Sequence, residues 1–516
     1  MLYPFGFGLS YTDFIIKDID FSVGSEKINV SAVIKNTGSV AGKKAVGLYL
    51  NQSGGALPVP ATVLKAFCKT KELAPGEEQR LDFSVSFYDI SSYDDAGKTG
   101  FKSAYVLCEG SYEFCLGFDV RNTVKAGVFE CKKTEVTKQL TEISAIEEEN
   151  SFMRFVPMND NGKTRVTYER APVRTVSLKK TIEKNLPETL YMTVGKRYTL
   201  EDVKEERTTM ESFVATLSYE ELEAISRGDY VMNSPLGAKG NAGVFGGVLE
   251  SLREKGVPPI TTTDGPSGIR IGAYSALFPC GTALASTWNC ELVQELYRLL
   301  GTEMRERGSD VLLAPGLNIH RNPLCGRNFE YFSEDPVSSG YMASAVTKGL
   351  QSSGVSACPK HFACNNQEVR RTKNNSVLSE RALREIYLKG FEICVKEAKP
   401  LNIMTSYNKI NGVWGHYNYD LVTGILRGEW GYEGCVMTDW WMQPSESPEF
   451  PVMKNQAYRV RAGVNVLMPG GGRTGKREPD GTLLESLGKE GGITTGEMQK
   501  NAAEILRMII TLQKMR

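Results

Sequence analysis

The 516-residue sequence has few histidines, no excess of charge of either sign and no long apolar run. Lysine and arginine number 61, and aspartate and glutamate also number 61, so the formal net charge is zero. This balance argues against broad electrostatic binding to nucleic acid or to a membrane surface. No apolar run approaches the roughly 20 residues that span a bilayer. Three histidines, His320, His361 and His416, are too few for a histidine-rich metal site, and we expect no metal and no cofactor.

Cysteine spacing and the first residues bear on the cellular compartment. The 11 cysteines form no Cys-x-x-Cys pair and no zinc-spaced cluster, a pattern that favours buried, reduced thiols in a long chain. The opening residues, MLYPFGFGLSYTDF, lack the basic and apolar regions of a secretory signal. We therefore expect a cytoplasmic protein, and its ordinary hydrophobic content of 41% excludes global disorder.

Residues 1–135 are predicted to form a β-sandwich. Apolar and polar residues alternate in segments near 28–34, 46–50, 81–87 and 112–118. A period of two buries one face of a strand, and turn sequences such as Asn36-Thr37-Gly38 separate the segments. Several short strands punctuated in this way favour a sandwich.

Residues 209–516 show a different hydrophobicity pattern, in which short apolar runs alternate with amphipathic helical stretches. The apolar runs are 258–264, 311–315, 355–361, 401–407, 435–439 and 464–468. This alternation predicts a (β/α)8 barrel, with an open doubly wound sheet as the alternative. Residues 136–208 have no clear period, and we interpret them as a connecting segment.

Polar and aromatic residues gather where the predicted barrel strands end, which is where barrel enzymes place their chemistry. The ends supply Asp264, Lys360, His361, Tyr407, Asp439, Trp440 and Trp441, and the loop after the second run adds Arg327, Asn328 and Glu330. Carboxylates accept hydrogen bonds from sugar hydroxyls, and aromatic rings stack on the apolar face of a pyranose. For any single residue, a strand that turns polar as it leaves the core is the simpler explanation, but the coincidence of several favours a carbohydrate pocket.

Asp439 is the most informative of these residues. An aspartate after a strand often caps a helix, but two tryptophans follow this one, which favours an aromatic-walled pocket. Near Arg327, Lys360 and His361 its carboxylate is expected to stay ionised at neutral pH, as a nucleophile requires.

A phosphate-binding loop is the competing interpretation of another motif. The segment Gly470 to Lys476 follows an apolar run and fits GxxxxGK. However, Arg477 stands where such a loop carries serine or threonine, and Pro479 interrupts any following helix. We interpret the segment as an ordinary loop.

Several segments together resemble glycoside hydrolase family 3, which includes many β-glucosidases. The resemblance is carried by Thr263-Asp264-Gly265-Pro266, Gly326 to Glu330, Lys360-His361-Phe362, Met404 to Asn408 and Val436 to Trp441. In the first domain, Val33 to Gly42, Leu48-Tyr49-Leu50 and Leu73 to Glu77 resemble the fibronectin type III-like domain of that family. The implied architecture is a fibronectin type III-like sandwich followed by a (β/α)8 barrel.

The resemblance also implies roles for individual residues. Asp439 would be the catalytic nucleophile, and the remaining members would bind the sugar in the −1 subsite: Asp264, Arg327, Lys360, His361, Tyr407 and Trp440. The implied activity is that of a retaining, exo-acting β-glycosidase, with β-glucosidase as the first expectation and β-xylosidase behind it. Ala363-Cys364-Asn365 follows Lys-His-Phe in place of Gly-His-Gly, which argues against an N-acetylhexosaminidase.

The order of the segments departs from the usual family pattern, because the fibronectin-like part precedes the barrel. In the permuted branch of the family an α/β-sandwich domain comes first, and Tyr3 to Tyr11 resembles the segment that follows it. We therefore expect the α/β-sandwich, and the acid/base glutamate that it usually carries, to lie outside this chain. Glu330, Glu334 and Glu368 are the nearby carboxylates, and none has a motif that supports this role. An incomplete or split-enzyme fragment that binds sugar thus stays an alternative, with a separate sandwich domain or chain as partner. Homo-oligomerisation is left open.

Overall fold

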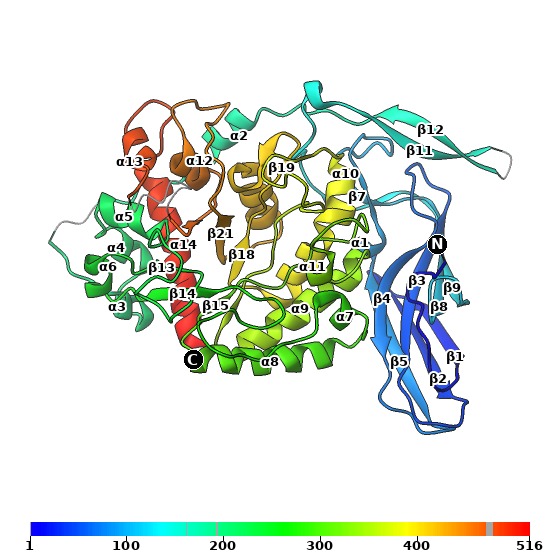
Figure 1. Ribbon diagram of the computed structural model, residues 1–516. Coiled ribbons are helices and arrows are strands. Elements are labelled where there is room, and N and C mark those ends of the chain that lie inside the picture. The colour runs from blue at the N-terminus through cyan, green and yellow to red at the C-terminus, as the bar shows by residue number, and fades with distance from the viewer. Residues whose placement is uncertain (1, 161–162, 192–194, 471–477) are drawn as a thin grey trace. The chain divides into compact units, whose positions relative to one another are not determined.

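The computed structural model describes residues 2–160, 163–191, 195–470 and 478–516. Its internal contacts divide the chain into two compact units (Figure 1). The first comprises Met1–Arg174, Thr287–Asn289 and Ser379–Ile386, and the second comprises Thr175–Ser286, Cys290–Leu378 and Tyr387–Arg516. No helix in the described part of the chain is long and apolar enough to cross a bilayer. The domain boundaries at residues 135 and 208 stay predictions.

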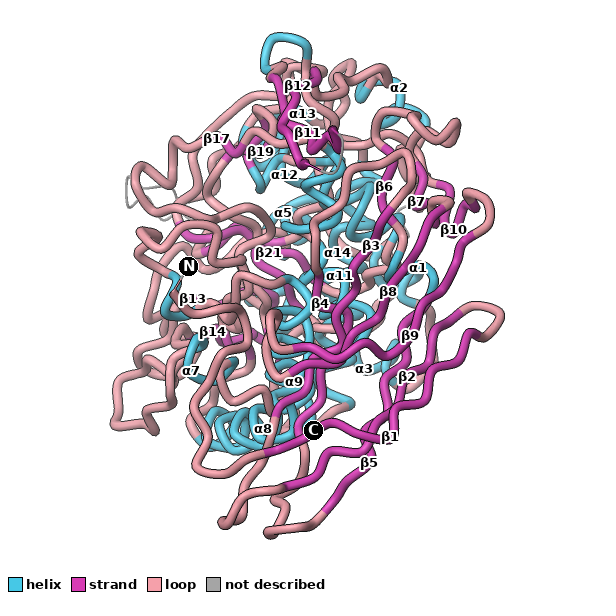
Figure 2. The backbone as a smooth tube through the Cα atoms, turned by 90° about the vertical axis from the view of Figure 1, so that its right-hand side faces the viewer, coloured by secondary structure: helices cyan, strands magenta, loops and turns pink. Residues whose placement is uncertain are grey.

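The first unit contains the predicted sandwich strands, which run side by side in Figure 2. One sheet has the order β1-β2-β5 and another the order β4-β3-β8-β9. The bounds are β1 Phe14–Val23, β2 Lys27–Asn36, β3 Ala45–Ser53, β4 Val63–Lys69, β5 Glu78–Ser86, β8 Gly110–Gly117 and β9 Thr123–Cys131. A smaller sheet, β10-β7-β6, is formed by β6 Ser92–Asp94, β7 Ala104–Leu107 and β10 Glu135–Gln139, and the short helix α1 spans Phe87–Ile90.

The period-two alternation produces the core of this unit. On β2, Ile28, Val30, Ala32 and Ile34 are all buried, and they belong to the same hydrophobic cluster as the inward residues of β5, β3 and β8. Alternate residues of a strand point to one face, so both sheets contribute to one apolar layer.

A β-hairpin lies within the segment that sequence periodicity left without structure. It pairs β11 (Met153–Asp160) with β12 (Lys163–Arg170) in antiparallel register, with Phe155 opposite Tyr168. Both of these rings are exposed, so the hairpin has no buried face to impose a clear alternation. This is the physical reason why the hairpin was missed.

The second unit is built around two short sheets (Figure 1). One has the order β13-β14-β15-β16 and the other is the parallel sheet β18-β21-β22. The bounds are β13 Gly243–Gly246, β14 Pro259–Thr263, β15 Val311–Leu312, β16 Ser356–Ala357, β18 Asn402–Met404, β21 Cys435–Trp440 and β22 Val466–Met468. Single bridges join the sheets into a ring, from Phe362 to Thr405 on one side and from Arg227 to Leu467 on the other.

One strand of this ring breaks the regular barrel pattern. The strands β14, β15 and β16 are mutually parallel, whereas β13 pairs with β14 in antiparallel fashion. The chain reaches β13 from Gly228, which bridges to Phe245 in antiparallel orientation. In the described residues no helix stands between Gly228 and β13, and a parallel neighbour needs a long crossover. An all-parallel (β/α)8 barrel, as expected from the sequence, therefore differs from the observed arrangement at β13.

Helices precede the first ring strand, lie between the later ones and follow the last. The bounds are α2 Leu178–Lys184, α3 Leu200–Lys204, α4 Met210–Val214, α5 Tyr219–Ile225, α6 Glu250–Glu254, α7 Gly281–Ala285, α8 Cys290–Glu306, α9 Pro336–Ser352, α12 Asn455–Arg461, α13 Thr482–Ser486 and α14 Thr495–Lys514. The helical stretch before β18 consists of α10 (Glu380–Ala382), a π-helical turn η3 (Leu383–Tyr387) and α11 (Lys389–Ala398). The stretch before β21 is the π-helical segment η5 (Asp420–Glu429).

One small sheet and two short turns also belong to the second unit. The short strands β17 Asn375–Ser376, β19 Lys409–Ile410 and β20 Val413–Trp414 form a sheet of order β17-β19-β20, and 3-10 turns lie at η2 Asn328–Glu330 and η4 Gly415–Tyr417. The turn η2 belongs to the loop that supplies Arg327 to the candidate site.

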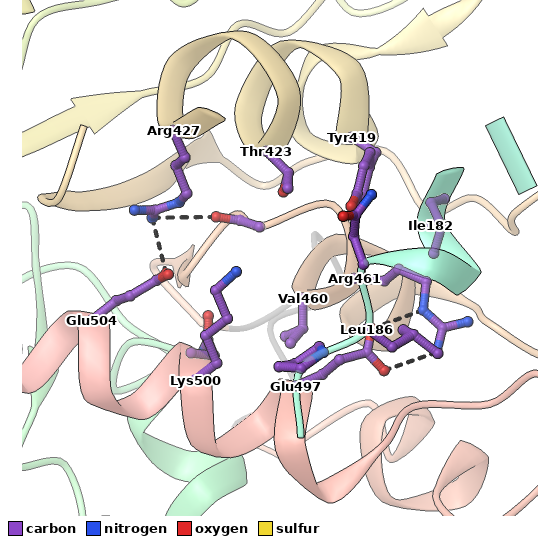
Figure 3. Close-up of a pocket in the computed structure, with 14 residues that line it drawn as sticks. Ile182, Leu186, Tyr419, Thr423, Arg427, Val460, Arg461, Glu497, Lys500 and Glu504 are labelled. Carbon is purple, nitrogen blue, oxygen red and sulfur yellow. Dashed lines mark hydrogen bonds and ion pairs between the residues drawn. The ribbon is translucent and has the colours of Figure 1, made fainter. Parts of the chain in front are cut away.

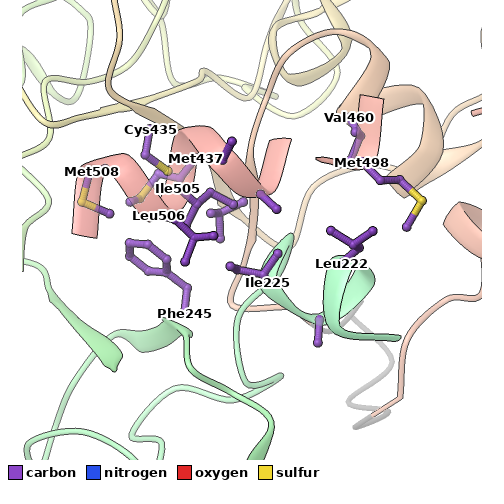
Figure 4. Packing of buried hydrophobic residues seen from close by; sticks show 14 of the residues in the cluster. Leu222, Ile225, Phe245, Cys435, Met437, Val460, Met498, Ile505, Leu506 and Met508 are labelled. Carbon is purple, nitrogen blue, oxygen red and sulfur yellow. The ribbon is translucent and has the colours of Figure 1, made fainter. Parts of the chain in front are cut away.

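The carboxyl-terminal helix α14 anchors the core of the second unit (Figure 4). Its apolar stripe, Met498, Ala502, Leu506 and Ile510, is buried throughout. These side chains share a cluster with Phe245 of β13 and Met437 of β21. Burying each large aliphatic side chain contributes about 1.5–3 kcal/mol. The helix thereby holds the inner strands whose ends carry the candidate site.

Candidate active site

The residues that follow the ring strands meet in one pocket with a volume of about 450 Å³. It contains all seven residues that the sequence assigned to the site: Asp264, Arg327, Lys360, His361, Tyr407, Asp439 and Trp440. Met232, Gly240, Ala242, Arg270, Leu313, Arg371, Met404 and Trp441 complete the lining. A pocket of this size, lined by charged, polar and aromatic side chains, suits a small polar ligand such as one sugar ring.

Asp439 has one oxygen that accepts a hydrogen bond and one that accepts none from the described residues. Its Oδ1 accepts a hydrogen bond of 2.7 Å from the backbone N–H of Trp440. Its Oδ2 is buried and accepts no hydrogen bond from any residue that the structure describes. The nearest cationic or imidazole nitrogen is His361 Nε2, 3.7 Å from Oδ2. A fixed carboxylate with one unsatisfied oxygen facing a pocket is a suitable nucleophile.

The charge of Asp439 is set by opposing effects. Burial raises the pKa of this carboxyl above its ordinary value. The hydrogen bond from Trp440 and the positive charges of Arg327 and Lys360 oppose that rise. Arg371 acts in the same direction as these two cations. The ionised state expected from the sequence therefore depends on the cations around the pocket.

Asp264 lies at the mouth of the pocket between two cations. Its Oδ1 accepts from Lys360 Nζ at 3.0 Å, and its Oδ2 forms an ion pair with Arg270. Lys360 is buried, and burial lowers the pKa of its ammonium group to about 8. Lys360 therefore carries its proton at neutral pH and can lose it in mildly alkaline solution.

Arg327 is held from behind by Glu330, three residues along the chain, through an ion pair. Burial by itself would lower the pKa of the Arg327 guanidinium, but Tyr331, Glu330 and Asp439 raise it above the ordinary value. The guanidinium is thus a permanent cation in the pocket.

His361 differs from the sequence expectation that grouped it with the cations. Burial and the neighbouring charges of Arg327 and Lys360 lower the pKa of its imidazole well below the usual value. The ring is therefore neutral at pH 7, and it can donate one hydrogen bond and accept another. Its backbone is clamped by Asn318, whose Oδ1 accepts from His361 N at 2.9 Å and whose Nδ2 donates to His361 O at 3.0 Å.

The aromatic residues are fixed by hydrogen bonds to the backbone. Trp440 Nε1 donates to Ala242 O at 2.8 Å, and Tyr407 Oη donates to Trp440 O at 2.8 Å. Trp440 is 6% exposed, whereas Trp441 is 39% exposed. Trp440 is therefore a rigid wall of the pocket, and Trp441 lies nearer its open side.

Two arginines of the pocket were not predicted. Arg371 places its guanidinium 4.6 Å from the centre of the Tyr407 ring and forms an ion pair of 2.9 Å with Glu368. Arg270 pairs with Asp264. Both lie in loops beyond the strand ends, where no sequence period fixes the path of the chain. The only sequence signals that could have pointed to these two arginines were the nearby motifs around Asp264 and Lys360.

No third carboxylate lines the pocket among the residues that the structure describes. Glu330 is bound to Arg327, Glu368 is bound to Arg371, and Glu334 is exposed. The pocket thus contains a nucleophile candidate without a free neighbouring acid. Within the described ranges, no cluster of three or more histidine, cysteine or acidic side chains could hold a metal ion.

A second, much smaller cavity of about 40 Å³ lies beside α14 (Figure 3). Two ion pairs border it, Arg427–Glu504 at 3.1 Å and Arg461–Glu497 at 2.8 Å. These pairs tie α14 to η5 and α12, and a space of this size holds no more than a water molecule or two. We interpret it as a structural site. The phosphate-loop candidate lies outside the described residues except for Gly470, because residues 471–477 are not described.

Comparison with known families gives two matches. The glycosyl hydrolase family 3 N terminal domain matches residues 245–508, and a fibronectin type III-like domain matches residues 44–120. A β-glucosidase of Ruminococcus albus is 42% identical over 516 residues, which is 99% of this chain and 53% of that protein. Beta-glucosidase A of Butyrivibrio fibrisolvens is 38% identical over 85% of this chain and 56% of its own length. The chain thus spans about half the length of the curated relatives that it matches.

Solved structures agree with these matches. A β-glucosidase from Paenibacillus barengoltzii is 43% identical with a TM-score of 0.92, covering 99% of this chain and 57% of that one. Beta-glucosidase 3B from Thermotoga neapolitana, solved in complex with glucose, is 40% identical with a TM-score of 0.53, covering 60% of this chain and 44% of that one. The family expected from the motifs is confirmed: this chain belongs to glycosyl hydrolase family 3.

Proposed function

We propose that the chain carries the sugar-binding and nucleophilic part of a retaining, exo-acting β-glucosidase. The observation that carries this proposal is Asp439, which has Oδ1 fixed by Trp440 N and Oδ2 without a hydrogen-bond partner among the described residues, and which lines a pocket with all the predicted sugar ligands. The glucose complex of the Thermotoga neapolitana enzyme, and the β-glucosidase names of the relatives, support glucose as the sugar.

In this mechanism Asp439 Oδ2 attacks the anomeric carbon of a bound β-glucoside. The bond to the leaving oxygen breaks while a glycosyl-enzyme ester forms, and water then cleaves the ester with a second inversion, so that the anomeric configuration is retained. Arg327 and Lys360 stabilise the carboxylate form of the nucleophile through their charge.

The remaining pocket residues bind hydroxyls and shape the subsite. Asp264 accepts hydrogen bonds from hydroxyls at the mouth, where Lys360 and Arg270 hold its carboxylate. Trp440 offers its ring as a wall for the apolar face of the sugar, and a pocket of about 450 Å³ fits one terminal residue, which favours exo action.

We propose that the general acid comes from outside these 516 residues. The carboxylates that the structure places in the pocket are Asp264 and Asp439, and the relatives are about twice as long as this chain. A separate α/β-sandwich domain or chain is the proposed source, in the permuted domain order. A cytoplasmic location is also proposed, and the burial of thiols such as Cys358 and Cys435 supports it.

Hydrolysis of an aryl β-glucoside tests the function. The purified chain is expected to release the aryl group and to yield β-glucose as the first sugar product, visible by NMR before mutarotation. Asp439→Asn is expected to abolish this release. The fragment alternative predicts glucose binding without release of the aryl group by either protein. Release of α-glucose as the first product would contradict a retaining mechanism.

A further inference from the structure

A chain of hydrogen bonds begins at His361 Nδ1, the ring nitrogen opposite the one nearest Asp439. The Tyr331 hydroxyl lies 3.1 Å from His361 Nδ1, and Asn365 Nδ2 lies 3.0 Å from the same hydroxyl. Asn365 Nδ2 also lies 3.0 Å from Glu368 Oε1. Tyr331, His361 and Asn365 are each no more than 1% exposed, so bulk water supplies none of them with a partner.

Which group donates and which accepts in each hydrogen bond follows from Glu368, at the end of the chain of bonds. Glu368 is engaged by Arg371 and has only acceptor atoms when ionised. The side-chain NH2 of Asn365 must therefore face Glu368, and the same NH2 donates to the Tyr331 oxygen. Burial raises the pKa of Tyr331, so its phenol keeps its proton. With its oxygen already accepting from Asn365, Tyr331 directs that proton to His361 Nδ1.

The hydrogen bond from Tyr331 determines which ring nitrogen of His361 carries the proton. A neutral imidazole has one N–H and one lone pair. If Nδ1 accepts from Tyr331, the hydrogen of His361 is on Nε2, which is the nitrogen that faces Asp439 Oδ2 at 3.7 Å. The clamp from Asn318 acts on the backbone and leaves this choice of tautomer to Tyr331.

We propose that Tyr331 and Asn365 are positioning residues that hold His361 in its Nε2–H tautomer, so that an N–H donor faces the pocket beside Asp439. A sugar hydroxyl bound there accepts a hydrogen bond from His361 Nε2–H. The hydroxyl can then donate its own proton in a hydrogen bond to a carboxylate of the pocket. This consequence for binding rests on the proposed glucosidase function, whereas the tautomer itself does not.

Nitrogen NMR of the histidine rings tests the tautomer directly. The chain has only three histidines, so selective 15N-histidine labelling gives few signals, and His361→Gln identifies those of His361. We expect Nε2 of the wild-type ring to show the signal of a protonated nitrogen and Nδ1 that of an unprotonated one. In Tyr331→Phe, which keeps the ring and loses only the donor, both signals are expected to move toward a mixture of tautomers. Asn365→Ala is expected to move them in the same direction.

Tyr432→Phe is the matched control. Tyr432 is also a buried tyrosine, and its hydroxyl donates to the backbone oxygen of Cys435 at 3.0 Å. Both substitutions remove a buried hydroxyl bond and are expected to lower the melting temperature similarly, but Tyr432→Phe should leave the His361 signals unchanged. Glucose affinity should fall roughly 3- to 10-fold in Tyr331→Phe alone, the range for one lost hydrogen bond.

Two results would overturn the inference. One is a wild-type His361 with its proton on Nδ1, and the other is an unchanged pair of nitrogen signals in Tyr331→Phe. Neither depends on turnover, so a chain that fails to hydrolyse glucosides still decides the question. Normal nitrogen signals with no glucose binding at all would contradict the proposed function and leave the tautomer assignment supported.

Discussion

The backbone N–H of Trp440 donates to Asp439 Oδ1 at 2.7 Å, whereas Asp439 Oδ2 accepts no hydrogen bond from the residues that the structure describes. A carboxylate oxygen that accepts a hydrogen bond is less nucleophilic than its open partner. Because Trp440 Nε1 donates to the backbone oxygen of Ala242, the residue before β13, the orientation of Asp439 depends on the end of β21 and on the segment that enters β13. The short run Thr438 to Trp440 therefore contains both the proposed nucleophile and its support.

Replacing Asp264 with alanine is expected to weaken glucose binding. The substitution removes an acceptor for sugar hydroxyls and leaves Lys360 without its carboxylate partner. Losing such a contact costs about 1–3 kcal/mol, which corresponds to roughly 5- to 150-fold in affinity. Isothermal titration with glucose measures it, and the exposed Glu490→Ala serves as a control in the same unit. Unchanged affinity in Asp264→Ala would show that this carboxylate does not contact the sugar.

Glucose binding is expected to depend on alkaline pH through Lys360. Its pKa is lowered to about 8 by burial, so the ammonium group is present below that pH and disappears above it. Affinity should therefore be level at neutral pH and decline as the pH rises through about 8. Lys360→Met should bind more weakly and show no decline in this window. A wild-type affinity that stays level well above pH 8 would contradict the role of the protonated amine.

Glu380 is expected to make folding stability depend on pH. In the first unit its Oε1 accepts from Tyr93 Oη at 2.6 Å and from Arg384 Nε at 2.9 Å. Burial raises the pKa of Glu380 to about 7, despite the opposing charge of Arg384. The folded state thus binds a proton that the unfolded state releases at a lower pH, near 4.5.

The stability that protonated Glu380 contributes is full below about pH 4.5 and is lost as the pH rises to about 7. This amounts to about 3 kcal/mol at most. Urea unfolding of the wild type and of Glu380→Gln at several pH values measures the effect. The free-energy difference between the two proteins should change across this window in favour of the variant at higher pH. A constant difference would refute the assignment.

Turnover by this chain alone is expected to depend on the leaving group. A positioned general acid contributes about 10²–10⁴-fold, chiefly by protonating a poor leaving group. Dinitrophenyl glucoside needs little protonation and should react at Asp439, whereas cellobiose should be almost untouched. Azide should speed turnover of the activated substrate, because a small anion attacks the glycosyl-enzyme without a general base.

Cleavage of cellobiose at an ordinary rate, about 10 s⁻¹, would instead place an acid within these 516 residues. Alanine variants of Glu330, Glu334 and Glu368 would then identify it. Glu330 and Glu368 are paired with arginines, so each would have to leave its partner to act.

The sequence predicts the elements of this protein best where burial imposes a period. Ile28 to Ile34 alternate because one face of β2 meets the sandwich core, and the stripe from Met498 to Ile510 recurs because one side of α14 is buried. The hairpin β11–β12 has exposed rings on both strands, so burial leaves no pattern to read. The antiparallel orientation of β13 could not be predicted either, because a short apolar strand has the same residue pattern in both orientations.

The site was predictable to the extent that its residues follow strands. Asp264 lies directly beyond β14, Lys360 lies three residues beyond the end of β16, and Asp439 lies near the end of β21. Arg371 reaches the same pocket from a loop, and Tyr331 and Asn365 act behind it. Their placement depends on how loops pack in three dimensions, which neither period nor spacing records. The neutral state of His361 also required the structure, because burial sets it.

Trapping the glycosyl-enzyme tests the central claim most directly. A 2-deoxy-2-fluoro-β-glucosyl donor with a dinitrophenyl leaving group should label the chain once, since fluorine slows breakdown of the ester more than its formation when the leaving group is good. Peptide mass mapping is expected to place the sugar on Asp439, and Asp439→Asn should take up no label. A label on any other carboxylate, or an equal label in Asp439→Asn, would contradict Asp439 as the nucleophile.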